Sequence, residues 1–310
     1  MYFPYLRGRQ FELLALKELV ENNLLCNKII PIIEPVKAST TFYNTIATFK
    51  KKGSNLAIII NPKVGTYYTD LTGYKKKDLL ISAINDKSII QAIILDSNIA
   101  ENINKLKNNG KVIPNSIIIS NEIKYLPFYQ NAAVTLSPLY DIILDDAAFR
   151  RTMRELGHKN KVMLRDPFPK KLRNADYPEN ENILLSADHR YFEEDGYIGY
   201  SDYSIVGNDY SDSGYAPHAI VLHITYLDSE QNLMLRHFKS KTNSDPSDPA
   251  NKFGEALESF IEWDSTMNLQ TRAAKLLHTM YNEGAYPGLG TIKKICIMQH
   301  LETMNEYFKG

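Results

Sequence analysis

Short apolar runs recur along the chain, and each stops at a polar residue. The eight runs occupy residues 29–33, 56–60, 92–95, 117–119, 133–136, 162–164, 197–200 and 220–222. A buried parallel strand has both faces covered, so it reads as a continuous apolar run. In a closed eight-stranded α/β barrel, residues that follow the strands gather at the C-terminal mouth, where such barrels carry their sites. The pattern predicts a (β/α)8 TIM-barrel-like fold of the α/β class with a site at its mouth.

Helical patterns separate these runs. Residues 10–21 place Leu13, Leu16 and Leu19 on one face, and residues 39–41 offer N-caps for a helix that ends near Gly53. Residues 145–156 form a further helical pattern, which stops at Gly157. This alternation of strand, polar loop and helix is typical of a parallel sheet.

The chain is long enough for one barrel with additions. We therefore expect a single barrel-like domain over residues 1–310. Its expected parts are an N-terminal helix segment at 1–24, a Pro-rich loop excursion over the barrel mouth at 167–196, a β-hairpin extension at 219–240 and C-terminal helices at 250–310.

Composition narrows the partners. The 36 basic residues balance 36 acidic ones, and the short basic runs at 50–52, 75–77 and 170–173 suit solvated helix ends or loops. Nucleic acid is therefore not an expected partner unless basic residues prove contiguous in the fold. There is no run of about 18 apolar residues and no signal-peptide core, so we expect a cytoplasmic protein without a membrane partner. Cys26 and Cys296 match no metal or disulfide spacing.

Acidic residues at the expected strand ends are the first candidates for chemistry. They are Glu34, Asp96, Glu122, Asp166 and Asp202. Carboxylates that converge on one mouth could hold Mg²⁺, for which Glu34, Asp96 and Asp166 are the candidate ligands. They could instead supply a general acid and base. Alternatively, each acid caps a helix or pairs with a neighbouring lysine.

Basic residues and histidines are the second set of candidates. Arg165 could bind phosphate or carboxylate through its forked guanidinium, unless it pairs with an adjacent acid such as Asp166. Lys63 follows the second run, and Arg236 lies in the expected hairpin. His223 is either a general base near neutral pH or a hydrogen-bonded core histidine.

Several short motifs resemble the phage-type beta protein family, in particular its shorter relatives that open with Tyr-Leu-Arg-Gly. They lie at residues 5–9, 31–35, 201–203, 235–237 and 299–300. The resemblance implies a barrel-like protein of bacteria and phages, encoded beside anti-phage or toxin and antidote genes, and it implies no particular reaction. The recurrent residues of the family correspond to Arg7, Glu34, Ser201, Asp202, Arg236 and His300.

The leading functional hypothesis is a cytoplasmic phage-defence or toxin-antidote component that binds a nucleotide-like or phosphorylated small ligand at the barrel mouth. The expected ligand-binding residues are Arg7, Lys63, Asp96, Arg165, Ser201 and Arg236. If the site hydrolyses a phosphodiester with Mg²⁺, the expected catalytic residues are Glu34, Glu122, Asp202 and His223.

The alternative is a non-enzymatic interaction protein that binds a protein partner encoded in the same locus. Its interface would be formed by the tyrosine-rich segment at 197–215 and by the C-terminal helices. The arrangement of the strand-end acids separates the two hypotheses. Acids that converge on an open pocket favour the ligand site, whereas paired acids in a filled mouth favour the interaction protein.

Overall fold

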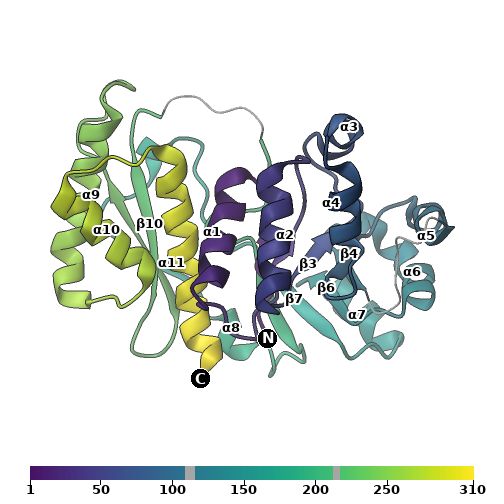
Figure 1. Ribbon diagram of the computed structural model, residues 1–310. Coiled ribbons are helices and arrows are strands. Elements are labelled where there is room, and N and C mark those ends of the chain that lie inside the picture. The colour runs from purple at the N-terminus through teal and green to yellow at the C-terminus, as the bar shows by residue number, and fades with distance from the viewer. Residues whose placement is uncertain (109–115, 212–216) are drawn as a thin grey trace.

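The computed structural model describes residues 1–108, 116–211 and 217–310. Eight parallel strands form a nearly closed barrel flanked by helices, so the predicted TIM-barrel-like fold is confirmed (Figure 1). In barrel order they are β1 (Tyr5–Leu6), β2 (Ile32–Ile33), β3 (Ala57–Ile59), β4 (Ile90–Ile94), β5 (Ile117–Ser120), β6 (Tyr140–Leu144), β7 (Lys161–Arg165) and β9 (Gly199–Asp202). The seam between β9 and the chain start is joined by a parallel bridge between Tyr2 and Tyr200.

Two of the eight predictions of a barrel strand are wrong. Residues 133–136 end helix α6, and the run at 220–222 leads into a strand of a separate sheet. Their places in the barrel are taken by β1 and β6. The apolar pattern did not reveal β6 because Asp141 interrupts it, and this carboxylate is buried against Tyr129, whose hydroxyl donates to it at 2.5 Å.

Helices cover the outside of the barrel. They are α1 (Gln10–Glu21), α2 (Thr40–Lys52), α3 (Tyr67–Gly73), α4 (Lys77–Ile84), α5 (Ile99–Asn108), the 3₁₀ helix η1 (Ile123–Phe128), α6 (Tyr129–Leu136) and α7 (Ala147–Glu155). Helix α2 shows why these segments are helical. The Ser39 hydroxyl accepts the Phe42 amide at its start, and Gly53 ends it in the left-handed region at φ 64°.

A second sheet lies beside the barrel. It contains β8 (Asn182–Ser186), β10 (Val221–Leu227) and β11 (Leu233–Lys239), with β11 in the centre and all pairs antiparallel. The segment at 167–196 therefore includes a strand of this sheet, besides η2 (Asn174–Asp176) and the short helix α8 (Asp188–Tyr191).

Three C-terminal helices complete the chain: α9 (Pro249–Met267), α10 (Arg272–Glu283) and α11 (Leu289–Lys309). Helix α11 contacts α1, α10 and β10, so it covers the barrel beside α1 and joins the barrel to the second sheet. Figure 1 shows α11 beside α1, with α9 and α10 at the end of the molecule away from α1. In the part of the chain that the structure describes, no helix is long and apolar enough to cross a membrane.

Side chains of the barrel strands alternate between the barrel interior and the layer under the helices, as the two-residue period of a strand requires. The interior cluster includes Phe3, Tyr5, Ile32, Ile59, Leu164 and Tyr203. The outer cluster includes Tyr2, Leu6, Ile33, Ile58, Met163 and Tyr200. This alternation decides which strand-end residues reach the mouth.

Candidate functional site

A buried ion pair between Arg7 and Glu34 occupies the centre of the mouth. Glu34 is fully buried, and its oxygens also accept the Tyr5 hydroxyl at 2.6 Å and the Lys63 amide at 2.7 Å. Gly8 permits this approach, since a Cβ there would lie 2.9 Å from the Glu34 carbonyl oxygen, at φ +62°. Arg7 and Glu34 thus come together as the sequence suggested, but as partners of each other.

Arg7 also contacts the loop that follows β9, across the seam of the barrel. Its second terminal nitrogen donates to the backbone carbonyl of Asn208 at 2.6 Å and to the side-chain oxygen at 2.9 Å. The guanidinium lies 5.1 Å from the ring centre of Tyr5 and 5.6 Å from that of Tyr203. Burial raises the pKa of Tyr203 to about 12, although Arg7 opposes the shift. The centre of the mouth is therefore filled by buried, mutually bonded side chains.

Lys63 and Asp96 form a second ion pair nearby, and both are partly shielded. Asp96 also accepts the Asn98 amide at 2.9 Å, which caps the turn after β4. Asn61 extends the pairing of β3 with β4, because it donates to the Ile94 carbonyl and accepts the Ile94 amide, both at 2.8 Å. The polar residues that follow β3 and β4 thus stabilise the strand ends, besides forming part of the rim of the mouth.

Arg165 ends β7 and Asp166 follows it, but the two side chains do not pair with each other. Arg165 contacts Asp145 at 2.6 Å and Asp188 at 3.6 Å, on the outer side of the rim. Asp166 instead accepts the Asn208 amide at 2.8 Å, so it reaches the mouth loop that Arg7 also contacts.

Asp202 faces away from the barrel interior. Its carboxylate accepts the Tyr2 hydroxyl at 2.7 Å and the Ser204 amide at 2.9 Å, and lies 3.4 Å from His300 of α11. Burial alone would raise the pKa of Asp202, but these contacts with His300, Tyr2 and the amide outweigh it and lower the pKa. The Asp202, Tyr2 and His300 side chains are fully buried between the barrel and α11. The expectation that Asp202 lies at the mouth is wrong, because the pleat of β9 turns it outward.

Two further expected site residues lie elsewhere. Glu122 projects into solvent and pairs with Lys124 at 2.5 Å. Ser201 is buried in the seam, where its hydroxyl donates to the Phe3 carbonyl at 2.6 Å. Ser201 therefore helps to close the barrel, and Glu122 takes part in a surface ion pair.

His223 and Arg236 belong to the second sheet, outside the barrel. Arg236 donates to the Asn182 side chain at 2.8 Å and lies 5.7 Å from the Trp263 ring centre. His223 pairs with His237 across the hairpin, with 2.9 Å between their Nδ1 atoms. Both expectations of a place at the mouth are wrong, since the eighth predicted strand is not part of the barrel.

The proposed metal ligands do not form a cluster. Within residues 1–108, 116–211 and 217–310, no group of three or more His, Cys, Asp or Glu side chains is arranged to hold a metal ion. Glu34 already accepts three donors, and Asp96 is engaged by Lys63. Glu34, Asp96 and Asp166 thus supply no common Mg²⁺ site in this arrangement.

A cleft of about 470 Å³ lies between the mouth loops, the second sheet and the start of α11. Its size is within the range of small-molecule sites. The lining includes the basic residues Arg9, Lys170, Lys171 and Lys293, the acid Asp209, and the rings of Phe168, Tyr177 and His223. The cleft adjoins the mouth, because Asn208 bonds both Arg7 and Asp166 and precedes the lining residue Asp209.

The basic residues of the cleft are held mainly by backbone oxygens. Lys170 donates to the Asp209 carbonyl at 2.9 Å, and Arg9 donates to the Ser211 carbonyl. Lys293 contacts Glu12 at 3.3 Å. Among the residues that the structure describes, neither Lys170 nor Arg9 forms an ion pair, so the cleft favours an anion.

Aromatic rings form one wall of the cleft. The His223 ring centre lies 5.3 Å from that of Phe168 and 4.7 Å from that of Tyr177. Burial lowers the pKa of His223 to about 3, with a smaller contribution from His237. Burial also lowers the pKa of His237 to about 4, helped by Lys171. Both imidazoles are therefore neutral near pH 7, and His223 offers the cleft a planar, uncharged face.

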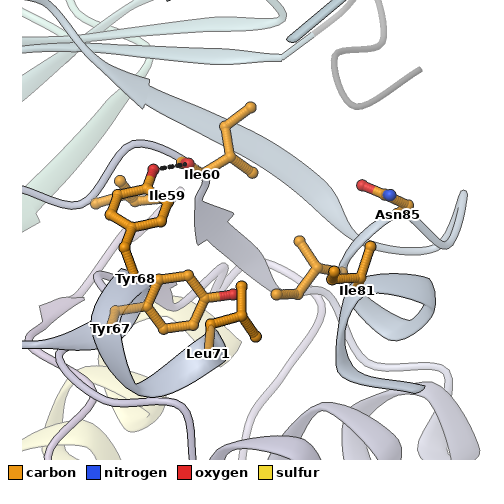
Figure 2. Close-up of a pocket in the computed structure, with 8 residues that line it drawn as sticks. Ile59, Ile60, Tyr67, Tyr68, Leu71, Ile81 and Asn85 are labelled. Carbon is orange, nitrogen blue, oxygen red and sulfur yellow. Dashed lines mark hydrogen bonds between the residues drawn. The ribbon is translucent and has the colours of Figure 1, made fainter. Parts of the chain in front are cut away.

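A smaller hollow lies beside the end of β3 and is drawn in Figure 2. It is lined mainly by apolar and aromatic side chains of β3, α3 and α4, and the Tyr68 hydroxyl donates across it to the Ile60 carbonyl at 2.8 Å. Its volume of about 80 Å³ is well below that of ordinary ligand sites. The larger cleft is the better candidate.

Sequence reasoning missed most of the cleft residues. Phe168 and Tyr177 were part of a loop-rich stretch, and Arg9 lay in a motif without an assigned role. Lys170 and Lys171 were visible as a basic run, which was interpreted as solvated. These residues form one site because the fold places them beside the hairpin. Nothing in the sequence indicates that they lie there.

Known proteins provide no further guide to the site. A scan against protein-family models and searches of curated proteins and of solved structures found no match. The chemistry of the cleft and of the mouth is therefore the guide to function.

Proposed function

We propose that this protein binds a phosphorylated small molecule with a planar ring, such as a nucleotide, in the cleft beside the barrel mouth. The observation that carries the proposal is the meeting of four basic side chains with three rings around one cavity. The ligand class is the one expected from the sequence, but its site is displaced from the mouth centre, which Arg7 and Glu34 fill.

Lys170 and Lys171 would contact the phosphate. In the described part of the chain, Lys171 has no ion-pair partner, and its backbone amide donates to the Tyr177 hydroxyl at 3.1 Å. A phosphate would replace the carbonyl contact of Lys170 with a charge-assisted bond, which is stronger. Neutral His223 with Phe168 and Tyr177 would hold the planar ring by stacking and edge contacts.

The proposal covers binding and no reaction. The expected catalytic residues lie in four separate environments, which are the mouth centre, the solvent-exposed surface, the α11 interface and the second sheet for Glu34, Glu122, Asp202 and His223, respectively. Proton transfer requires groups within hydrogen-bond reach of one substrate. This arrangement therefore supports a receptor for the ligand rather than a phosphodiesterase centred on those residues.

Isothermal titration with nucleoside monophosphates tests the proposal. We expect Lys171→Gln to weaken binding about tenfold, since a hydrogen bond to a charged group contributes about 1.5–3 kcal/mol. Adenosine tests the ring alone and ribose 5-phosphate tests the phosphate alone, and both should bind more weakly than the monophosphate.

The matched control is Lys275→Gln on the exposed face of α10, which removes the same charge away from the cleft. It should bind as the wild type does. The proposal fails if no nucleotide binds the wild-type protein, or if both lysine variants weaken binding equally.

A second candidate function is the interaction protein. The paired acids and the filled mouth favour it, since open, converging acids were the expectation for a ligand site. An apolar groove of about 420 Å³ between η1 and α7 supplies a surface, and the neighbouring Val134 is 78% exposed. The segment expected as the interface, 197–215, lies partly outside the described residues.

Co-expression with the adjacent genes separates the candidates. A partner that binds at this groove should be lost from the purified complex in Val134→Asp, and it should be retained in Leu172→Asp, which alters another exposed apolar residue. Retention in both variants would contradict the interaction candidate.

The biological setting implied by the beta protein resemblance, a cytoplasmic component of a phage-defence or toxin-antidote locus, is part of the proposal. Phage plaque counts on bacteria that express the locus test it. Protection that depends on Lys171 would link the setting to the cleft, and the absence of any protection would contradict the setting without contradicting ligand binding.

A further inference from the structure

A second concave surface, a basic groove of about 610 Å³, runs beside α7 on the outer wall of the barrel. Its basic residues are Arg150, Arg151, Arg154, His158, Lys159 and Lys161, and among the described lining residues Asp195 is the one acid. None of these residues belongs to the ligand cleft or to the mouth centre. The groove is therefore a separate feature with its own charge.

The topology of the chain explains why the groove exists. In a regular α/β barrel, a full-length helix follows each strand and packs beside the previous helix. Here β7 is followed by the excursion to the second sheet and then by α8, which has only four residues. The wall beside α7 is consequently left recessed, and one face of α7 lines it together with the segment that leads into β7.

Part of the positive charge in the groove is uncompensated. Arg150 pairs with Asp145, and the Lys161 ammonium lies 5.0 Å from the Tyr197 ring centre. Arg151, Arg154 and Lys159 are exposed, and they make no ion pair within the part of the chain that the structure describes. Like charges held together in this way repel one another, and a bound polyanion would relieve the repulsion.

The remaining lining residues indicate which polyanion fits. Besides the charged residues, the lining consists of Ala147 and two glycines. A protein interface draws its affinity from buried aromatic and aliphatic anchors, which this surface does not offer among its described residues. Non-specific nucleic-acid binding draws its affinity from phosphate neutralisation, which needs only Lys and Arg. A duplex is read by an element that projects into its grooves, whereas a recessed surface suits a flexible strand.

We propose that the α7 groove binds the phosphate backbone of a single nucleic-acid strand without reading its bases. Arg151, Arg154 and Lys159 contact successive phosphates, and Arg150 and Lys161 add to the local potential. Among the described residues no Phe, Tyr or Trp lines the groove, and the His158 ring is held against Tyr129 and the Asp141 carboxylate. The bases therefore do not stack on the groove, and binding is independent of sequence.

Fluorescence anisotropy of a labelled oligo-dT at a series of salt concentrations tests the proposal on the full-length protein. For a single strand, the logarithm of the association constant falls with that of the salt concentration by about 0.7 per neutralised phosphate. Three contacts predict a slope near 2, by the same relation. The double variant Arg151→Glu with Arg154→Glu should lose at least about tenfold in affinity and most of this slope.

The control variant is Lys51→Glu with Lys75→Glu, which changes the net charge equally at exposed sites of other basic runs. It should bind oligo-dT as the wild type does. Circular dichroism checks that each variant folds. Lys159→Gln removes one positive charge from the groove without adding a negative one, so it should weaken oligo-dT binding less than the double arginine variant does. Lys171→Gln in the ligand cleft should leave oligo-dT binding unchanged, which keeps this test independent of the proposed function.

Three results would overturn the inference. The first is that the wild-type protein does not bind oligo-dT at low salt. The second is that the control variant loses as much affinity for oligo-dT as the double arginine variant does. The third is that poly-glutamate of the same length displaces oligo-dT and binds with the same affinity. The last result would assign the groove to acidic proteins instead.

Discussion

At the scale of single residues, the buried ion pair of Arg7 with Glu34 makes the clearest prediction. Glu34→Ala would leave the Arg7 guanidinium buried without a countercharge, because Arg7 is 8% exposed and Glu34 is fully buried. Breaking one partner of such a pair costs about 3–5 kcal/mol of unfolding free energy. Urea denaturation measures this loss.

The exposed pair of Arg173 with Asp176 provides the comparison. Arg173→Gln should change the unfolding free energy far less than Glu34→Ala does, since solvent screens surface pairs. Equal losses in Glu34→Ala and Arg173→Gln would show that the mouth pair is not desolvated as described.

The histidine pair of the hairpin predicts how stability depends on pH. Folding lowers the pKa values of His223 and His237 to about 3 and about 4, from an unfolded value of about 6.5. The unfolded chain therefore binds more protons than the folded protein below about pH 6.5. The contribution of the two neutral histidines to the unfolding free energy is thus present above that pH and is lost as the pH falls toward 4. Each histidine adds a slope of up to about 1.4 kcal/mol per pH unit in this window.

The double variant His223→Leu with His237→Leu should flatten the loss of unfolding free energy between about pH 6.5 and pH 4. His218→Asn, at an exposed position, should leave the wild-type slope. An unchanged slope in the double variant would contradict the neutral, buried pair, and chemical denaturation at several pH values supplies the measurement.

At the scale of elements, the seam between β9 and the chain start is the sensitive join of the barrel. Gly199 lies there, and a Cβ on it would meet the Phe3 ring at 2.9 Å and the Met1 carbonyl at 3.0 Å. Gly199→Ala should destabilise the protein by about 1–3 kcal/mol, as overpacking of a filled core does. Thermal unfolding followed by circular dichroism measures the change.

Helix α9 offers a matched glycine in open surroundings. A Cβ on Gly254 would meet nothing within 4 Å, so Gly254→Ala should instead stabilise the helix by up to about 1 kcal/mol. A destabilised Gly254→Ala, or an unaffected Gly199→Ala, would contradict the packing described for these elements.

At the scale of the whole molecule, the barrel was predictable but not all of its strands were. The runs that became β2 to β5 and β7 are strongly apolar, because both faces of these strands are covered. β1 forms only a two-residue ladder next to Pro4, and β6 contains Asp141, so neither shows an uninterrupted run. Residues 133–136 are apolar because they are the buried end of α6, and a short apolar run does not distinguish helix from strand.

The candidate site was predictable only in part. Arg7, Glu34, Lys63 and Asp96 do gather at the mouth, since they follow neighbouring parallel strands. Asp202 does not join them, because side chains in a strand alternate and a shift of one residue exchanges the two faces. His223 and Arg236 were assigned to the mouth through a strand that belongs to the other sheet.

The sequence by itself determined the α/β barrel class and the polar character of its mouth, because both follow from local runs of side chains that must be buried or solvated. Tertiary structure alone decided that the mouth is filled by Arg7 and Glu34, and that the ligand cleft lies between the barrel and the second sheet. It also brought residues 150–161 together as a basic groove. These features depend on segments far apart in the chain, or on a wall left without a helix, and local pattern contains neither kind of information.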